Sequence, residues 1–267
     1  MKKLSLLIAL FVLYPLYAQN KEYTHNLQEI KKVQIQSNTP IKVVGVDTKK
    51  LTLSFLQKNK NNELFDSKIS LIESKKKDKK AGLTAIFPGG KDDTNGFGFS
   101  VEKTNNTLHL NDLKSRYAES IIIKIPMNLN FSIESKKFAN ITIDGFSSEI
   151  EAKSNIGEIN MKNITGPITV NSKIGGINIE FSTINQSSPT TISSAIGEID
   201  VSLPSTTNAD LDIKTNGTIY TNFNFKKLTK EELSESSENR KIKNSINKGG
   251  VKISLKSSKG NIYLRKR

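Results

Sequence analysis

Acidic and amide side chains recur at matching places in the second half of the chain. They follow glycines in short segments of one form, at Glu158, Asn160, Asn178, Glu198 and Asp200. Paired carboxylates on one face of a protein can cleave glycosidic bonds. If these segments stack as strands, Glu158 and Glu198 would lie two turns, roughly 10 Å, apart with Gly176 between them. Acids on an outward strand face mostly keep a surface hydrated, so we predict no catalytic pair there.

A second acidic group has part of the spacing of a calcium-binding loop. Segment 92–96 reads DDTNG, and Glu102 follows it. In EF-hand register Gly96 and Glu102 take positions 6 and 12, but position 1 is then Lys91, which cannot ligate a cation. The segment therefore predicts a turn.

The amino-acid composition excludes several kinds of catalytic and metal-binding site. The chain has no cysteine, which excludes disulfides, a thiol nucleophile and Cys-ligated metals. Two histidines, His25 and His109, are expected at ordinary surface or half-buried positions. Nucleophile-elbow and zinc-protease motifs are absent from the sequence. We predict no catalytic, cofactor-binding or metal-binding residues, and a protein that is not an enzyme.

The positive charge has an ordinary explanation. The 267 residues include 40 Lys and Arg against 26 Asp and Glu, a formal net charge of +14. Nearly all the basic residues are Lys, which guards exposed sheet edges, whereas nucleic-acid readers favour Arg. The tightest cluster, 75–80, is predicted to be a solvated loop. We expect no specific nucleic-acid partner, although non-specific attraction of an anionic polymer stays open.

The first 18 residues predict a secretory signal peptide. Lys2 and Lys3 precede an apolar run from Leu4 to Tyr17, and Ala18 precedes an abrupt change to polar sequence. No later stretch reaches the 18 apolar residues of a membrane helix. We expect an exported protein without a membrane span in the mature chain, located in the periplasm, on the cell surface or outside the cell.

The strongest signal is a repeat. The pattern x-Gly-x-Ile-x-apolar occurs in five segments: Ile156–Met161, Ile174–Ile179, Ile196–Val201, Asn216–Thr221 and Lys259–Leu264. A period near 20 residues is too short for a propeller blade or a helical pair. It fits one turn of a β-solenoid, in which each turn is stabilised by its neighbours.

Alternation within the repeats supports strands. Apolar side chains fall at every second position, so they share one face. Stacked turns would form an apolar ladder of Ile159, Ile177, Ile199, Ile219 and Ile262. An irregular β-sandwich or meander with glycine turns would give a similar pattern. We predict an all-β fold, a single-stranded β-helix (β-solenoid) with turns of about 20 residues.

The repeat also guides the predicted organisation of the rest of the chain. Residues 19–267 are predicted to form one β-helical domain, with less regular strands in 19–130, regular repeats in 131–225, a polar excursion in 226–248 and C-terminal strands in 249–267. The excursion includes a short helix at 229–233, and the C-terminal strands are expected to cap the stack. In the first part we predict strands near 68–72 and 83–87, and an isoleucine-rich strand before Pro126 that is buried on both faces.

An export signal, the Ile123–Ile133 stretch and a terminal segment GGVKISLKSSKGNIYL resemble a bacterial β-strand-repeat family of unknown function. That family is adhesin-like and related to the head GIN domain group. The resemblance implies a β-helix and a cell-envelope location, and it offers no catalytic residues. One departure is Ile-Gly in three repeats, where Asn-Gly is commoner in the family.

We therefore expect an exported, non-enzymatic envelope protein, an adhesin or interaction scaffold that presents a polar β-helix surface to an envelope protein or glycan. Two alternatives stay open. One is a polysaccharide lyase or hydrolase, which predicts a deep groove with clustered acids. The other is an anionic-polymer binder, which predicts a lysine stripe and salt-sensitive binding.

Overall fold

Alternating burial along the strands builds two facing sheets. The computed structural model describes residues 21–56, 82–114, 119–225 and 240–267, which form strands and turns and contain no helix. In the strand Ile168–Ile174, Ile168, Val170 and Ser172 are buried while Thr169 is exposed. The inward side chains of both sheets meet in one hydrophobic core. The all-β class and the solenoid are confirmed.

Within the described residues, each sheet has ten strands. In spatial order, sheet A contains β1 (Glu22–Asn26), β4 (Lys50–Phe55), β7 (Ile121–Pro126), β3 (Ile41–Val46), β9 (Ile141–Phe146), β11 (Ile159–Ile164), β13 (Ile177–Phe181), β15 (Ile199–Leu203), β20 (Ile262–Lys266) and β17 (Ile219–Thr221).

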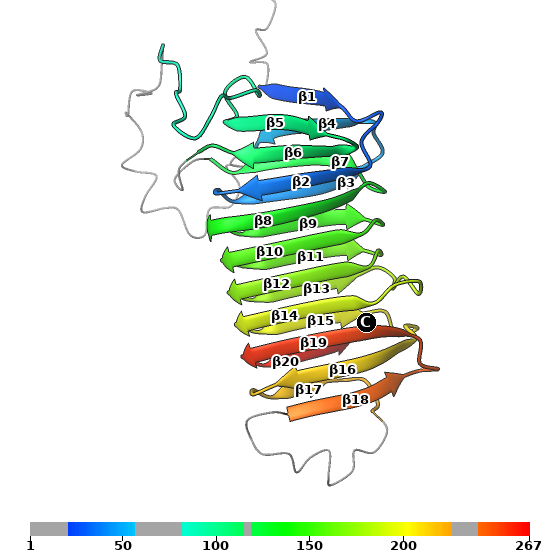
Figure 1. Cartoon of the computed structure of the whole chain (residues 1–267). Coiled ribbons are helices and arrows are strands. Elements are labelled where there is room, and N and C mark those ends of the chain that lie inside the picture. The colour runs from blue at the N-terminus through cyan, green and yellow to red at the C-terminus, as the bar shows by residue number, and fades with distance from the viewer. Residues whose placement is uncertain (1–20, 57–81, 115–118, 226–239) are drawn as a thin grey trace, which may run out of the picture.

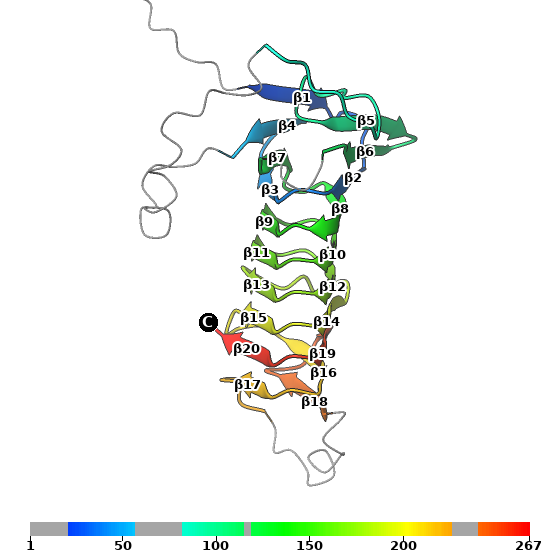
Figure 2. The ribbon, with the colours of Figure 1, turned by 90° about the vertical axis from the view of Figure 1, so that its left-hand side faces the viewer.

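Sheet B runs alongside it, as Figures 1 and 2 show. From the same end of the coil, its order is β5 (Phe99–Thr104), β6 (Thr107–Asp112), β2 (Lys32–Ser37), β8 (Asn130–Phe138), β10 (Ile150–Ile156), β12 (Ile168–Ile174), β14 (Thr190–Ile196), β19 (Val251–Lys259), β16 (Ala209–Thr215) and β18 (Arg240–Ile246).

A strand of sheet B and the next strand of sheet A make one turn of the coil, which we call a rung. Rungs such as β10/β11 and β12/β13 pair in parallel and in register. The predicted isoleucine ladder is confirmed, because Ile159 pairs with Ile177, and Ile177 with Ile199. Ile262 is next, followed by Ile219, which is only half buried on the end rung.

The order of the rungs differs from the order of the chain. The sequence predicted that the C-terminal strands cap the stack, and this is wrong. Rung β19/β20 lies between β14/β15 and β16/β17 and pairs with both. Likewise, β2/β3 lies between β6/β7 and β8/β9. Each end of the chain therefore supplies an interior rung.

Antiparallel pairing occurs at three of the four sheet ends, at β1 and β4 in sheet A and at β5 and β18 in sheet B. At the fourth end, β17 pairs in parallel with β20. Strand β18 occupies 240–246, inside the stretch predicted as a polar excursion, because Ile242 and Ile246 pair opposite the inward side chains of β16. Residues 226–239, with the predicted helix at 229–233, lie outside the described residues.

Two other expectations in the first half were wrong. Residues 83–87 form no strand, and Leu83 and Ile86 are exposed. In β7, Ile121, Ile123 and Ile125 are buried but Lys124 is exposed, so this strand also buries one face. The strand predicted at 68–72, the lysine cluster at 75–80 and the leader at 1–18 lie outside the described residues. Among the residues that are described, no helix could cross a membrane.

Candidate functional site

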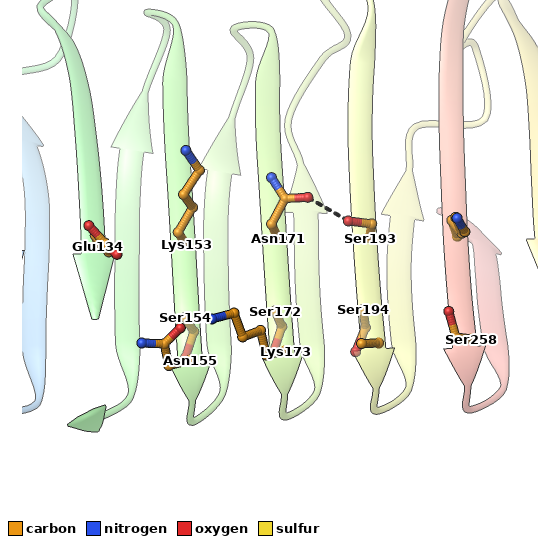
Figure 3. A pocket seen from close by; sticks show the side chains of 12 residues that line it. Glu134, Lys153, Ser154, Asn155, Asn171, Ser172, Lys173, Ser193, Ser194 and Ser258 are labelled. Carbon is orange, nitrogen blue, oxygen red and sulfur yellow. Dashed lines mark hydrogen bonds between the residues drawn. The ribbon is translucent and has the colours of Figure 1, made fainter. Parts of the chain in front are cut away.

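The outward face of sheet B carries a shallow cleft of about 390 Å³, shown in Figure 3, which we call the sheet B cleft. Its lining is polar and includes three lysines, Lys153, Lys173 and Lys256, and one acid, Glu134. Ammonium groups outnumber carboxylates three to one in this lining, so the cleft favours an anionic ligand.

Strand register sets the row of side chains along the cleft. Glu134 pairs with Lys153, Lys153 with Asn171, Asn171 with Ser193 and Ser193 with Lys256. Neighbouring rungs are about 4.8 Å apart, so this row spans roughly 19 Å along the coil. The site is thus an extended track along the axis of the coil.

The three lysines differ in their surroundings. The Lys153 ammonium lies 2.6 Å from the Glu151 carboxylate, and the hydrogen bond that it donates to this carboxylate raises the pKa of Lys153. Lys173 extends toward Ser154 and Asn155 (Figure 3). Within the described part of the chain, Lys173 and Lys256 make no ion pair. Their charges are therefore available to a ligand.

A hydrogen-bonded pair lies at the middle of the cleft. The Ser193 hydroxyl donates to Asn171 Oδ1 at 2.5 Å, drawn as the dashed line in Figure 3. These groups come from neighbouring strands of a packed sheet, β12 and β14. The pairing of these two strands therefore fixes the positions of the side chains at the middle of the cleft.

The acids singled out in the sequence lie away from this cleft, Asp200 in strand β15 of sheet A and Glu158 and Glu198 at the corner that leads into sheet A. Glu158 and Glu198 directly precede strands β11 and β15, and Gly176 precedes β13 between them. This is the two-rung separation that the sequence predicted. Glu198 Oε1 accepts hydrogen bonds from Asn261 Nδ2 at 3.1 Å and from the Tyr263 hydroxyl at 3.2 Å.

Asp200 is held by an ion pair, and its neighbours Asn160 and Asn178 are joined by a hydrogen bond. Arg265 donates to both carboxylate oxygens of Asp200, with the shortest contact at 2.7 Å. Farther along the row, Asn178 Nδ2 donates to Asn160 Oδ1 at 2.8 Å. Asp200 and Arg265 line a hollow of about 220 Å³ whose lining contains neither Glu158 nor Glu198. The geometry does not bring the predicted acids together at one cavity.

The calcium-like segment is a turn, as predicted. Asp92 accepts hydrogen bonds from the Thr94 amide at 2.8 Å, the Thr94 hydroxyl at 2.6 Å and the Gly96 amide. Burial alone would raise the pKa of Asp92, but these hydrogen bonds outweigh it and lower the pKa overall. Glu102 lies on β5, exposed and opposite His109.

The histidines lie on different sheets. His25 is on β1 in sheet A and His109 on β6 in sheet B, and both are half buried. Among the described residues, no group of three acids or histidines could hold a metal ion.

The sequence analysis missed a buried ion pair at the N-terminal end of sheet B. Lys114 Nζ lies 2.9 Å from Asp112 Oδ1, donates to the Phe97 carbonyl at 2.7 Å and sits 3.9 Å from the centre of the Phe99 ring. Asp112 Oδ2 accepts from the Thr39 hydroxyl at 2.8 Å. The sequence contained a signal for this pair. Asp112 continues the alternating inward positions of its strand after Leu108 and Leu110, and a buried acid needs partners. These contacts give the buried ammonium and carboxylate groups their polar partners.

Comparison with known proteins identifies one matching family. The family model described as Toastrack DUF4097 matches residues 132–265, half of the chain, which run from β8 to β20 and include the sheet B cleft. No curated protein matches the chain. A solved structure, a "putative cell adhesion protein" from Clostridium sporogenes, is 13% identical with a TM-score of 0.43, and the match covers 93% of this chain and 100% of that one.

Proposed function

Because the chain belongs to the Toastrack DUF4097 family, we propose that it is a non-enzymatic interaction protein of the adhesion type, which presents the outward faces of its coil to a partner. The observation that carries this proposal is the in-register row of side chains along the sheet B cleft. A track of repeated polar groups on a rigid coil suits binding of an extended partner.

The arrangement of acids supports binding over catalysis. A glycosidase needs two carboxylates facing one cavity. Asp200 and Glu180 do line one hollow, but Arg265 pairs with the first and Arg267 with the second. Glu198 is engaged by Asn261 and Tyr263, and Glu158 lies two rungs from Glu198. The faces are shallow and their charges dispersed, as expected of a scaffold.

We further propose that the protein is exported and acts in the periplasm or at the cell surface. The charged start, apolar run and polar boundary within residues 1–20 support this location. N-terminal sequencing of the protein recovered from the periplasm and the medium tests it. A mature terminus near Gln19 is expected, and a cytoplasmic protein that retains Met1 would contradict it.

A second candidate function is binding of an anionic polymer in the sheet B cleft. It is favoured by Lys153, Lys173 and Lys256, which line one track with a single acid, Glu134. Polymer carboxylates or sulfates spaced along an extended chain could contact these ammonium groups in succession. Such binding releases counterions and weakens as salt rises.

Titration of the purified protein with alginate, a uronic-acid polymer, at several salt concentrations tests this function. With three lysines in contact, log K should fall against log salt with a slope of about −2, at roughly −0.7 per charge. Each of Lys153→Gln and Lys256→Gln should weaken binding about two- to fivefold and make the slope shallower. Lys162→Gln, an exposed lysine on sheet A, is the matched control and should change neither.

Two results would contradict the proposals. Equal weakening by Lys153→Gln and Lys162→Gln would show that net charge, and not the cleft, attracts the polymer. Shortening of alginate chains by the purified protein, detected as new chain ends, would show an enzyme.

A further inference from the structure

Four apolar side chains, three of them exposed, line one corner of the coil. At the ends of neighbouring sheet B strands, Phe138 is 63% exposed, Ile174 45%, Ile196 46%, and Ile156 is half buried. Ile156 pairs with both Phe138 and Ile174, and Ile174 pairs with Ile196, so the four form one line. We call this line the corner ridge.

The corner ridge is not part of the hydrophobic core. The turns that carry it join each sheet B strand to the next sheet A strand, where the sheet B arrows end at the left of Figure 1, and these turns face the viewer in Figure 2. The core is filled by inward side chains such as Ile177 and Val170. Apolar side chains aligned on a surface mark an interaction site more often than isolated ones do. On the following rung the line ends, because Lys259 takes the position opposite Ile196.

Opposite charges flank the two sides of the ridge. On the sheet B side, Lys137 precedes Phe138 and Lys173 precedes Ile174, and both lysines are exposed. On the sheet A side, Glu158 and Glu198 follow the ridge by two residues and are also exposed. The ridge is thus apolar in the middle, basic along one side and acidic along the other.

We propose that the corner ridge binds the corner ridge of a second copy of this chain, side by side and parallel, about a two-fold axis along the coil. That rotation brings each side chain of the ridge against its own counterpart. It also exchanges the two flanks, so Lys173 of one copy faces the partner's acidic side, between the levels of Glu158 and Glu198. A two-fold axis perpendicular to the coil would instead place lysines against lysines.

The same charges favour a second copy over a lipid membrane. An anionic bilayer would attract the lysine flank but repel Glu158 and Glu198. The ridge spans three rung spacings, about 14 Å, which is short of a standard stable interface. Weak self-association is therefore expected in solution, and it would strengthen if copies are held close together on a surface.

Sedimentation velocity of the purified protein over a wide concentration range tests the proposal. A reversible monomer–dimer equilibrium is expected. The pair Ile174→Asn and Ile196→Asn should raise the dimer dissociation constant roughly tenfold or more, because it removes the centre of the contact. Asn before Gly suits the turn, and an unchanged circular dichroism spectrum and melting temperature control for folding. A protein that stays monomeric at all concentrations overturns the proposal.

Charge reversal distinguishes a second copy from a membrane. Lys173→Glu should weaken the dimer, and adding Glu158→Lys with Glu198→Lys should restore part of the loss, since both charges that face position 173 are then reversed as well. If the ridge instead inserted into anionic vesicles, the triple change would strengthen vesicle binding without any dimer, and the proposal would fail.

Crosslinking reports the orientation. The chain has no cysteine, so single changes Phe138→Cys and Ile196→Cys each introduce one thiol. In the parallel pair, each variant should form a disulfide-linked dimer with itself under mild oxidation. In an antiparallel pair, these two positions at opposite ends of the ridge would crosslink to each other in a mixture and not to themselves, and that outcome contradicts the parallel arrangement.

Discussion

Single glycines set how closely the rungs stack at each corner. Gly175 has a φ of +141°, and a Cβ built on it would lie 2.2 Å from the carbonyl oxygen of Gly157 on the next rung. The same contact joins Gly197 to Gly175. The obstacle is backbone in a corner that is fixed by the paired strands on either side and by the hydrogen bond from the Gly157 amide to the Ile174 carbonyl, so neither partner can move aside. The repeated glycine of the sequence pattern is thus required by rung spacing as much as by the turn.

Gly175→Ala should therefore lower the free energy of unfolding by about 3 kcal/mol, from backbone strain together with the clash. Its neighbour supplies the control, because a Cβ on Gly176 would lie 3.7 Å from the nearest atom, the Glu198 carbonyl oxygen. Gly176→Ala should change stability by only about 0.5 kcal/mol. Urea unfolding followed by circular dichroism measures both, and equal stabilities of the two variants would show that the corner tolerates a side chain.

The buried Lys114 links stability to pH. Burial, the largest influence, lowers the pKa of Lys114 from its ordinary value, although Asp112 opposes the shift. Below the lowered pKa both the folded and the unfolded chain carry the proton, and the cost of burying the charge is fully present. Between the lowered pKa and the unfolded value of 10.5 the unfolded chain binds more protons, so this residue's contribution to stability rises with pH.

Lys114→Met should remove that rise, because the variant has no amine to titrate. The measurement is the difference in unfolding free energy between the natural chain and the variant from neutral pH to about pH 10. Taking the difference cancels other groups such as Tyr23, whose pKa is raised by burial and whose contribution falls with pH. A difference that stays constant over this range would show that Lys114 keeps its proton in the folded protein.

At the scale of the strand, the sequence was informative wherever alternation was clear. Ile159, Ile177 and Ile199 were predicted to touch along the axis, and they pair in register. Residues 83–87 also alternate in part, but no neighbouring strand covers Leu83 or Ile86. Alternation therefore shows which side chains could face a core, and the presence of a neighbouring rung decides whether they do.

A buried hydroxyl row shows a second signal that the sequence analysis did not use. Ser154, Ser172 and Ser257 each stand three residues before a corner glycine, and all three are buried. Ser154 donates to the Gly157 carbonyl at 3.1 Å, and Ser172 donates to the Gly175 carbonyl at the same distance. A hydroxyl at an inward position satisfies a corner carbonyl that would otherwise be buried without a partner. The pattern Ser-x-x-Gly is therefore a second sequence signal for the corners, in addition to the glycine.

The candidate site was harder to predict than the strands. The lysines of the sheet B cleft are spread over more than 100 residues of sequence, from Lys153 to Lys256, and only the register of β10, β12, β14 and β19 brings them into one track. Exposed lysines occur throughout this chain, so none of them stands out in the sequence. Such a site becomes visible only when the order of the rungs is known.

At the scale of the whole molecule, the repeat pattern does not determine the order in which the rungs stack. The interfaces between rungs bring together similar apolar inward side chains, so the repeat pattern does not specify which rung pairs with which. The insertion of β19/β20 is compatible with the sequence, but the pattern itself does not select it. The lengths of the connections and the antiparallel strand β18, which covers the outer edge of β16, complete the arrangement.

Deletion of residues 251–267 tests the consequence of this order. In a solenoid stacked in chain order, loss of the last rung leaves the preceding rungs folded. Here β16 and β17 join the rest of their sheets through β19 and β20, so the deletion removes the link between the end rung and the coil. Hydrogen exchange should show that amide protection is lost over 209–221 and 240–246 but kept over 150–181. The control is Ile219→Ala, a half-buried position on the end rung, which should reduce protection only locally. Protection of 209–221 in the deleted chain would mean that the end rung can pair directly with β14/β15, and that the interior position of the C-terminal strands is dispensable.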